Sequence, residues 1–168
     1  MNEIAAAVGV SKLTIYRRYP SKEALLIAVV DHHLDELIER VERVHADGLS
    51  PLEALRQTAR TLFDFSIEPE SIRFARLLIG ESVHNDCLSE RFADWQKIVR
   101  APLVGGILAA QRTCEITPGD PVALSAILGD LMDGVAKDLR QNPAAIEATD
   151  ARRSFDQRWE FFRRAACR

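Results

Sequence analysis

Residues 4–19 contain the pattern that most restricts the fold of this chain. Ile4 and Val8 are four residues apart, so they share one face of a helix. Gly9 follows at once, and glycine can adopt the left-handed backbone conformation that ends a helix. The segment therefore predicts a short helix that stops at a tight turn.

A second short helix is expected directly after the turn, over residues 12–18. Ser11 is a residue type that caps the N-terminus of a helix, and Ile15 is expected to turn inward against Ile4, Val8 and Val10. Residues 1–22 hold four basic residues and one acidic residue, a local charge of +3 in a chain whose total is −3. A basic helix of this size fits the major groove of DNA. The pattern predicts a helix-turn-helix, and the simpler alternative is a helical hairpin with an incidental basic surface.

This segment also carries a resemblance to a known family. The run Ile4-Ala5 … Gly9-Val10-Ser11-Lys12 … Thr14-Ile15-Tyr16 … Tyr19-Pro20-Ser21-Lys22-Glu23-Ala24-Leu25-Leu26 closely resembles the signature of the TetR family of bacterial transcriptional repressors. The resemblance implies a homodimer that binds a palindromic double-stranded DNA operator and is released by a small-molecule effector. It also implies which residues contact DNA, namely Ser11, Lys12, Leu13, Thr14, Tyr16, Arg17 and Lys22.

One departure from the family pattern concerns the start of the chain. Members of the family normally have a further amphipathic helix before the position of Ile4, whereas only three residues precede it here. The three-helix unit is therefore expected to lack its first helix, and Ile4, Val8 and Ile15 are expected to lose burial. The alternative function is a dimeric helical ligand-binding module that has lost operator binding.

Length and composition fit a soluble, cytoplasmic protein. A chain of 168 residues with 47% hydrophobic residues can bury a core as one domain with a small appendage. No apolar run approaches the roughly 18 residues of a transmembrane helix, and no secretory signal is evident. Cys87, Cys114 and Cys167 lack metal-binding spacing and are expected to be free thiols, with redox sensing as the alternative.

Beyond the turn, apolar residues recur at helical spacing and no strand-like alternation appears. Helices are expected from residue 22 to about 46, from 51 to about 67, from 69 to 81, from 87 to 112 with a bend near Pro102 or Gly105-Gly106, from 121 to about 141, and through 155–166. The fold class is therefore all-α. An incomplete helix-turn-helix domain in residues 1–24 would precede a helical-bundle ligand-binding and dimerisation domain in residues 25–168.

The last two helices carry apolar stripes that suit a four-helix dimer interface. The alternatives are that both stripes pack inside one protomer, and that the arginines of the last helix form a second nucleic-acid patch. The expected interface residues are Leu124, Ser125, Leu128, Gly129, Met132, Ala136, Phe155, Trp159 and Phe162.

The middle helices are expected to surround an effector cavity. A mostly apolar cavity with one carboxylate would suit a hydrophobic or cationic small molecule. Each apolar member of the set could instead be ordinary core, and Glu81 could lie at the edge of its stripe. The expected lining residues are Leu62, Phe63, Phe74, Leu78, Glu81, Trp95 and Ile98.

The sequence contains no pattern that indicates an enzyme or a cofactor. No Ser/His/Asp set, phosphate-binding glycine loop or nucleotide fingerprint is present. Glu42–His45 and Glu81–His84 have the spacing used by di-iron helical bundles, but such a site also needs glutamates from two further helices at matching depth. No metal site is expected.

Overall fold

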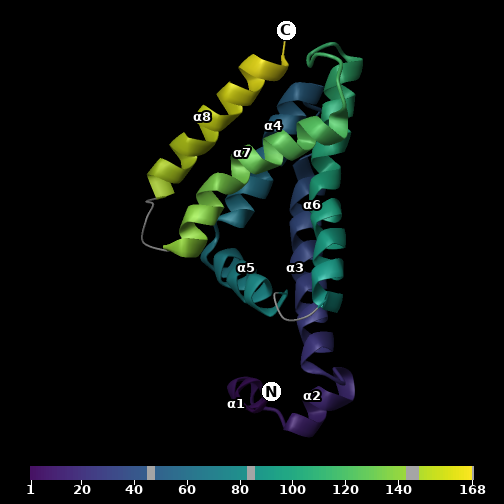
Figure 1. Ribbon diagram of the computed structural model, residues 1–168, viewed down its shortest axis with the longest axis vertical. Helices are drawn as coiled ribbons and strands as arrows, with labels where there is room; N and C mark the ends of the chain where they lie inside the picture. The colour runs from purple at the N-terminus through teal and green to yellow at the C-terminus, as the bar shows by residue number, and fades with distance from the viewer. Residues whose placement is uncertain (45–47, 83–85, 143–147, 168) are drawn as a thin grey trace. The chain divides into compact units, whose positions relative to one another are not determined.

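The computed structural model describes residues 1–44, 48–82, 86–142 and 148–167, and this part of the chain is built from helices (Figure 1). The prediction of an all-α fold is confirmed. None of the helices within those ranges is long and apolar enough to cross a membrane. The helices are α1 (Asn2–Val8), α2 (Lys12–Arg18), α3 (Lys22–Val44), α4 (Pro51–Ser66), α5 (Pro69–Ser82), α6 (Asp86–Arg112), α7 (Pro121–Gln141) and α8 (Ala148–Ala166).

Several helices begin at capping residues that the sequence places there. Ser21 Oγ accepts a hydrogen bond of 3.0 Å from the backbone N–H of Ala24 at the start of α3. At α4, Ser50 Oγ accepts from Glu53 N–H at 3.3 Å, and at α7 Asp120 Oδ1 accepts from the following turn at 2.9 Å. Proline occupies the first turn of both α4 and α7, where its missing N–H costs nothing. α6 continues through Pro102 without interruption.

The chain divides into two compact units, residues 1–36 and 37–168. The division falls inside α3, later in the sequence than the domain boundary expected after residue 24. The smaller unit contains α1, α2 and the first part of α3. In this part of α3 the buried apolar side chains are Leu26 and Val30.

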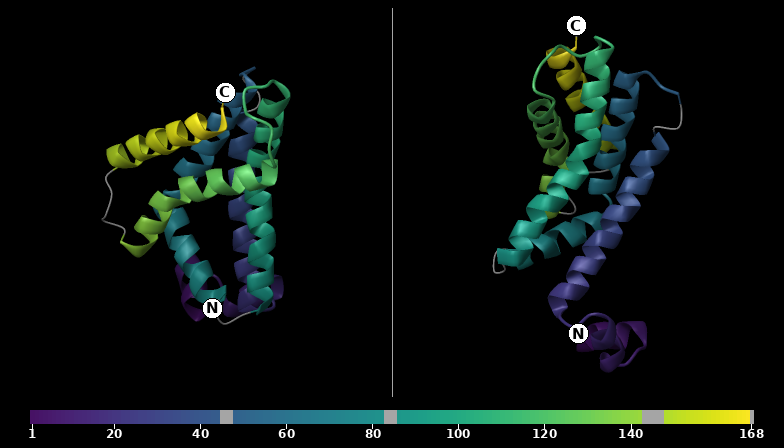
Figure 2. Two further views of the ribbon diagram at one scale, coloured as in Figure 1. Left: turned by 45° about the horizontal axis from the view of Figure 1, so that its top comes forward. Right: turned by 90° about the vertical axis from the view of Figure 1, so that its right-hand side faces the viewer.

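The core of the larger unit lies among α4, α6, α7 and α8. α4 contacts all three of the other helices, and α7 runs between α8 and α6 in Figure 1; Figure 2 shows the same helices from two further directions. Phe63 of α4 and Phe155 of α8 are fully buried, with their ring centroids 5.4 Å apart. At the other end of α8, the backbone N–H and the hydroxyl of Thr117 donate to Ala166 O at 2.8 and 2.9 Å.

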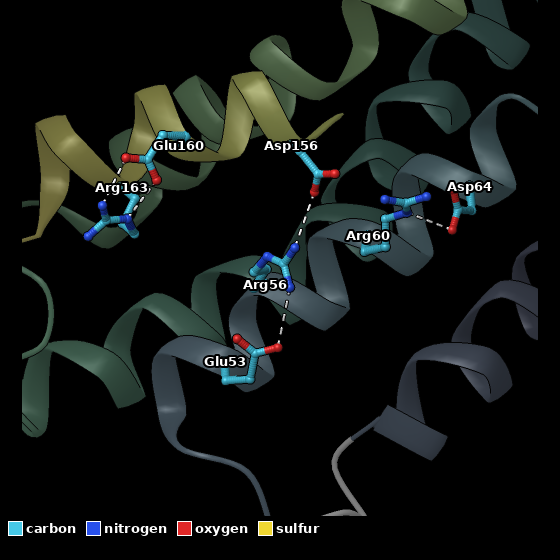
Figure 3. A network of polar contacts seen from close by, with 7 residues as sticks. All are labelled: Glu53, Arg56, Arg60, Asp64, Asp156, Glu160 and Arg163. Atoms are coloured by element: carbon cyan, nitrogen blue, oxygen red, sulfur yellow. Dashed lines mark hydrogen bonds and ion pairs between the residues drawn. The ribbon is translucent and has the colours of Figure 1, made fainter. Parts of the chain in front are cut away.

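Polar contacts along the surface also join α4 to α8 (Figure 3). The guanidinium of Arg56 lies 3.5 Å from Glu53 and 3.1 Å from Asp156. These partners are about half exposed, so the ion pairs contribute at most about 1 kcal/mol each. Arg60 lies over the Phe155 ring at 4.8 Å. Apolar packing, rather than surface charge, holds α8 in place.

α6 packs closely against α4 at Gly106. A Cβ placed on Gly106 would lie 2.9 Å from Cδ1 and 3.3 Å from Cβ of Leu55, which is fully buried. The neighbouring Gly105 has no heavy atom within 4 Å of the same position. A side chain at position 105 would therefore meet no other atom, whereas one at position 106 would clash with Leu55.

We expect Gly106→Ala to lower the free energy of unfolding by about 1–3 kcal/mol, because the added methyl group overpacks the core against Leu55. Gly105→Ala should raise it by roughly 0.5–1 kcal/mol, since alanine favours the helix. Urea denaturation followed by circular dichroism measures both. Equal effects of the two substitutions would contradict the packing described for α4 and α6.

Candidate nucleic-acid interface

The turn between α1 and α2 is set by the backbone of Gly9. Its φ of 68° and ψ of 26° place it in the left-handed region. The N–H groups of Val10 and Gly9 donate to Ala5 O at 3.1 Å and Ala6 O at 3.4 Å. This pair of bonds satisfies carbonyl groups at the end of α1 and is the Schellman arrangement. The turn therefore requires a residue that tolerates positive φ.

Ser11 begins α2 and fixes its first turn. Its Oγ accepts a hydrogen bond of 3.1 Å from Thr14 N–H, and the hydroxyl groups of the two residues are 2.8 Å apart. The backbone of Ser11 is extended, with φ −72° and ψ 149°, as a capping residue requires. Ser11, one of the residues expected to contact DNA, thus has a structural role as the cap of α2.

One face of α2 is buried and the rest is exposed. Ile15 is only 8% exposed, which confirms that it turns inward. Leu13 is 73% exposed. The Nζ of Lys12 lies 5.7 Å from the centroid of the Tyr16 ring, a cation–π distance. The exposed side chains include the whole set expected to contact DNA: Ser11, Lys12, Leu13, Thr14, Tyr16, Arg17 and Lys22.

The apolar residues expected to cover Ile15 differ in their burial. Ile4, Val8 and Val10 are 41%, 61% and 41% exposed, so they do not form the expected buried wall. The only buried residue of α1 is Ala5, at 6%. The loss of burial expected for Ile4 and Val8 is observed, but the same expectation for Ile15 is wrong. Burial in this pair of helices is thus confined to Ala5 and Ile15.

The first residues of the chain match a known family. Residues 1–29 match the family model described as bacterial regulatory proteins, tetR family. The opening segment of the chain is therefore similar to the DNA-binding segment of TetR-family regulators. The HTH-type transcriptional activator FasR of Mycolicibacterium smegmatis is 37% identical to it over 71 residues, which are 42% of this chain. The matched segment spans only 32% of the length of FasR.

Solved structures share the fold over almost the whole chain. A TetR-family regulator from Mesorhizobium loti has a TM-score of 0.81 at 19% identity, covering 99% of this chain and 85% of that one. A transcriptional regulator from Saccharomonospora viridis, solved in complex with choline, has a TM-score of 0.81 at 16% identity, covering 99% and 86%. At these identities the likeness shows a shared fold.

The larger unit contains a cavity of about 260 Å³ between α4, α6 and α7. Leu62 and Phe63, two of the residues predicted to line an effector cavity, are part of its lining. The other expected residues, Phe74, Leu78, Glu81, Trp95 and Ile98, lie outside its lining. Ile98 is 46% exposed. Helical spacing identified the face of the helix on which it lies but could not show whether another helix covers that face. The lining also includes polar side chains that no sequence pattern indicated: Ser66, Gln96, Arg100, Asp130 and Asp133.

Most residues expected at a dimer interface are buried within one protomer. Leu124 and Gly129 are half-buried. Seven more belong to the core, namely Ser125, Leu128, Met132, Ala136, Phe155, Trp159 and Phe162. A regular apolar stripe predicts burial but cannot tell a partner helix of the same chain from one of another copy. Phe161, which lies beside the stripe of α8, is 66% exposed.

The outer face of α8 surrounds Phe161 with charge. Hydrogen bonds from Arg163 and Arg164 to Glu160, all 2.8 Å long, lower the pKa of that carboxyl group to about 2. The carboxylate therefore stays ionised at neutral pH. A shallow depression on this face is lined by Arg153, Asp156, Gln157, Glu160, Phe161 and Arg164.

The remaining candidate groups form no further site among the residues that the structure describes. His45 and His84 of the Glu-x-x-His pairs lie outside those residues, as does the side chain of Cys87. No group of three potential metal ligands is found within the described ranges. Cys114 and Cys167 are free thiols, and burial raises the pKa of Cys167.

Proposed function

We propose that this protein is a DNA-binding transcriptional repressor that acts as a homodimer on a palindromic operator. The observation that carries the proposal is the geometry of α2. The Gly9 turn and the Ser11 cap fix the helix, Ile15 anchors its inner face, and the basic and polar side chains of its outer face are exposed. Such a face can enter the major groove of DNA.

A homodimer would supply the two-fold symmetry that a palindromic operator requires. The outer face of α8 supports this assembly, because it combines an exposed aromatic side chain with a charged rim, the usual arrangement in protein interfaces. Two copies of α2 would then lie in successive major grooves, about 34 Å apart.

Release from DNA by a small molecule is supported by the cavity between α4, α6 and α7. The similar protein from Saccharomonospora viridis holds choline, so a protein of this fold can accept a small ligand. A ligand shifts an equilibrium only by its difference in affinity for the two states. We infer that the effector binds the DNA-free conformation more tightly.

The first test measures the contribution of α2 to DNA binding. Duplexes selected from a random pool with the parent protein serve as the operator. Lys12→Ala should weaken binding roughly tenfold and reduce the slope of log K against log salt concentration by about one, since one cation facing the duplex is lost. Fluorescence anisotropy at several salt concentrations measures both quantities.

Lys97→Ala is the matched control for this test, because Lys97 is an exposed lysine of α6 that pairs with Asp94. It should bind the selected duplex as the parent does. Equal losses in the two variants would contradict the role of α2. A dimer that selects no duplex from the pool would instead support the ligand-binding module without operator binding.

The second test concerns the outer face of α8. We expect Phe161→Ser to convert the dimer to a folded monomer, because it removes the largest exposed apolar side chain of that face. Leu77→Ser, which changes an apolar residue of α5 that is 48% exposed, should leave the dimer intact. Analytical ultracentrifugation distinguishes the species, and a Phe161→Ser dimer of unchanged stability would rule out this face as the interface.

A further inference from the structure

The cavity between α4, α6 and α7 has apolar walls and a polar opening. All three helices contribute apolar side chains to it, and its volume is about 260 Å³. This is below the roughly 300–1,000 Å³ of most pockets for drug-sized ligands, so the ligand must be small. The apolar lining consists of Ala59, Leu62, Phe63, Val99, Leu103 and Met132.

The charged groups of the lining are not equivalent. Asp133 is held by two hydrogen bonds from Arg140, at 3.0 and 2.7 Å, which neutralise its charge. Asp130 is exposed, so water screens its carboxylate. Arg100 is half-buried and makes no hydrogen bond or ion pair with any residue in the described part of the chain.

The position of Arg100 places its guanidinium at the junction of α6 and α7. Its Nε would lie 4.0 Å from a Cβ built on Gly129, so the side chain reaches across from its own helix to the backbone of α7. A partly buried cation without a partner is unfavourable, and an anion that enters the cavity would supply the missing partner. Guanidinium groups bind carboxylates through two parallel hydrogen bonds.

We propose that this cavity binds a small amphipathic anion, a carboxylate with an apolar tail, and that Arg100 anchors the carboxylate. The tail lies against the apolar walls, where its burial provides affinity. This assignment differs from the hydrophobic or cationic ligand expected from the sequence, because Glu81 is not part of the lining. Its regulatory meaning rests on the proposed function, whereas the binding event itself does not.

The test compares three probes of one chain length: octanoate, octanol and octylammonium. Isothermal titration calorimetry with the full chain, in the absence of DNA, measures each affinity. Octanoate should bind saturably, octanol at least tenfold more weakly, and octylammonium more weakly still. Octanoate should also raise the thermal midpoint of unfolding with increasing concentration, since it binds the folded state.

Four variants test which charged side chain binds the carboxylate of octanoate. Arg100→Met should weaken octanoate binding at least tenfold and leave octanol binding unchanged, because it removes the charge and retains an apolar side chain. Arg100→Lys keeps the charge but cannot form two parallel hydrogen bonds, so it should weaken octanoate binding less than Arg100→Met does. Asp130→Asn should strengthen octanoate binding slightly, as a nearby negative charge is removed. Arg112→Met, on an exposed part of the same helix, is the control and should have no effect.

Three results would overturn the proposal: no saturable binding of octanoate, tighter binding of octylammonium than of octanoate, or equal octanoate affinity in Arg100→Met and the parent. These results are independent of DNA binding. If octanoate binds through Arg100 while no duplex is selected from the random pool, the anion site stands and the repressor function fails. If a duplex is selected but octanoate does not bind, the proposed DNA-binding function stands and the anion site fails.

Discussion

The conformation of Gly9 is the constraint on which the proposed DNA-binding face depends. α1 and α2 have seven residues each, too short to be stable as isolated helices in water. What fixes them is the left-handed turn, with its two backbone hydrogen bonds to α1, followed by the hydroxyl cap of Ser11. Because Ile15 is the one buried side chain of α2, the turn decides which residues of that helix remain outside.

In the larger unit, most of the residues expected at a dimer interface are buried within one protomer. Phe155 of α8 packs against Phe63 of α4 with tilted rings, and Gly106 lets α6 approach Leu55 closely. Outside this core lie the exposed Phe161 with its charged rim and the half-buried Arg100 at the edge of the cavity. The first suits a second copy of the chain, and the second suits an anionic ligand.

Local signals in the sequence predicted the elements well, and long-range contacts less well. Gly9, Ser50 and Asp120 end or begin helices as expected, since capping depends on neighbouring residues only. The periodicity that identified Phe155 as buried could not tell whether its partner was α4 or another protomer. Most residues that line this cavity were not predicted for the same reason. Arg100, for example, lies at the cavity because α6 crosses α7, which is a contact between residues far apart in the sequence.

The most direct test of this account is the affinity of Gly9→Ala for a duplex selected by the parent protein. No atom would obstruct the added methyl group, so its effect is purely conformational. A left-handed alanine costs about 1–2 kcal/mol, which predicts roughly tenfold weaker binding. Gly80→Ala, at an exposed helical glycine of α5, should bind as the parent does. Unchanged affinity in Gly9→Ala would show that the turn does not govern DNA recognition.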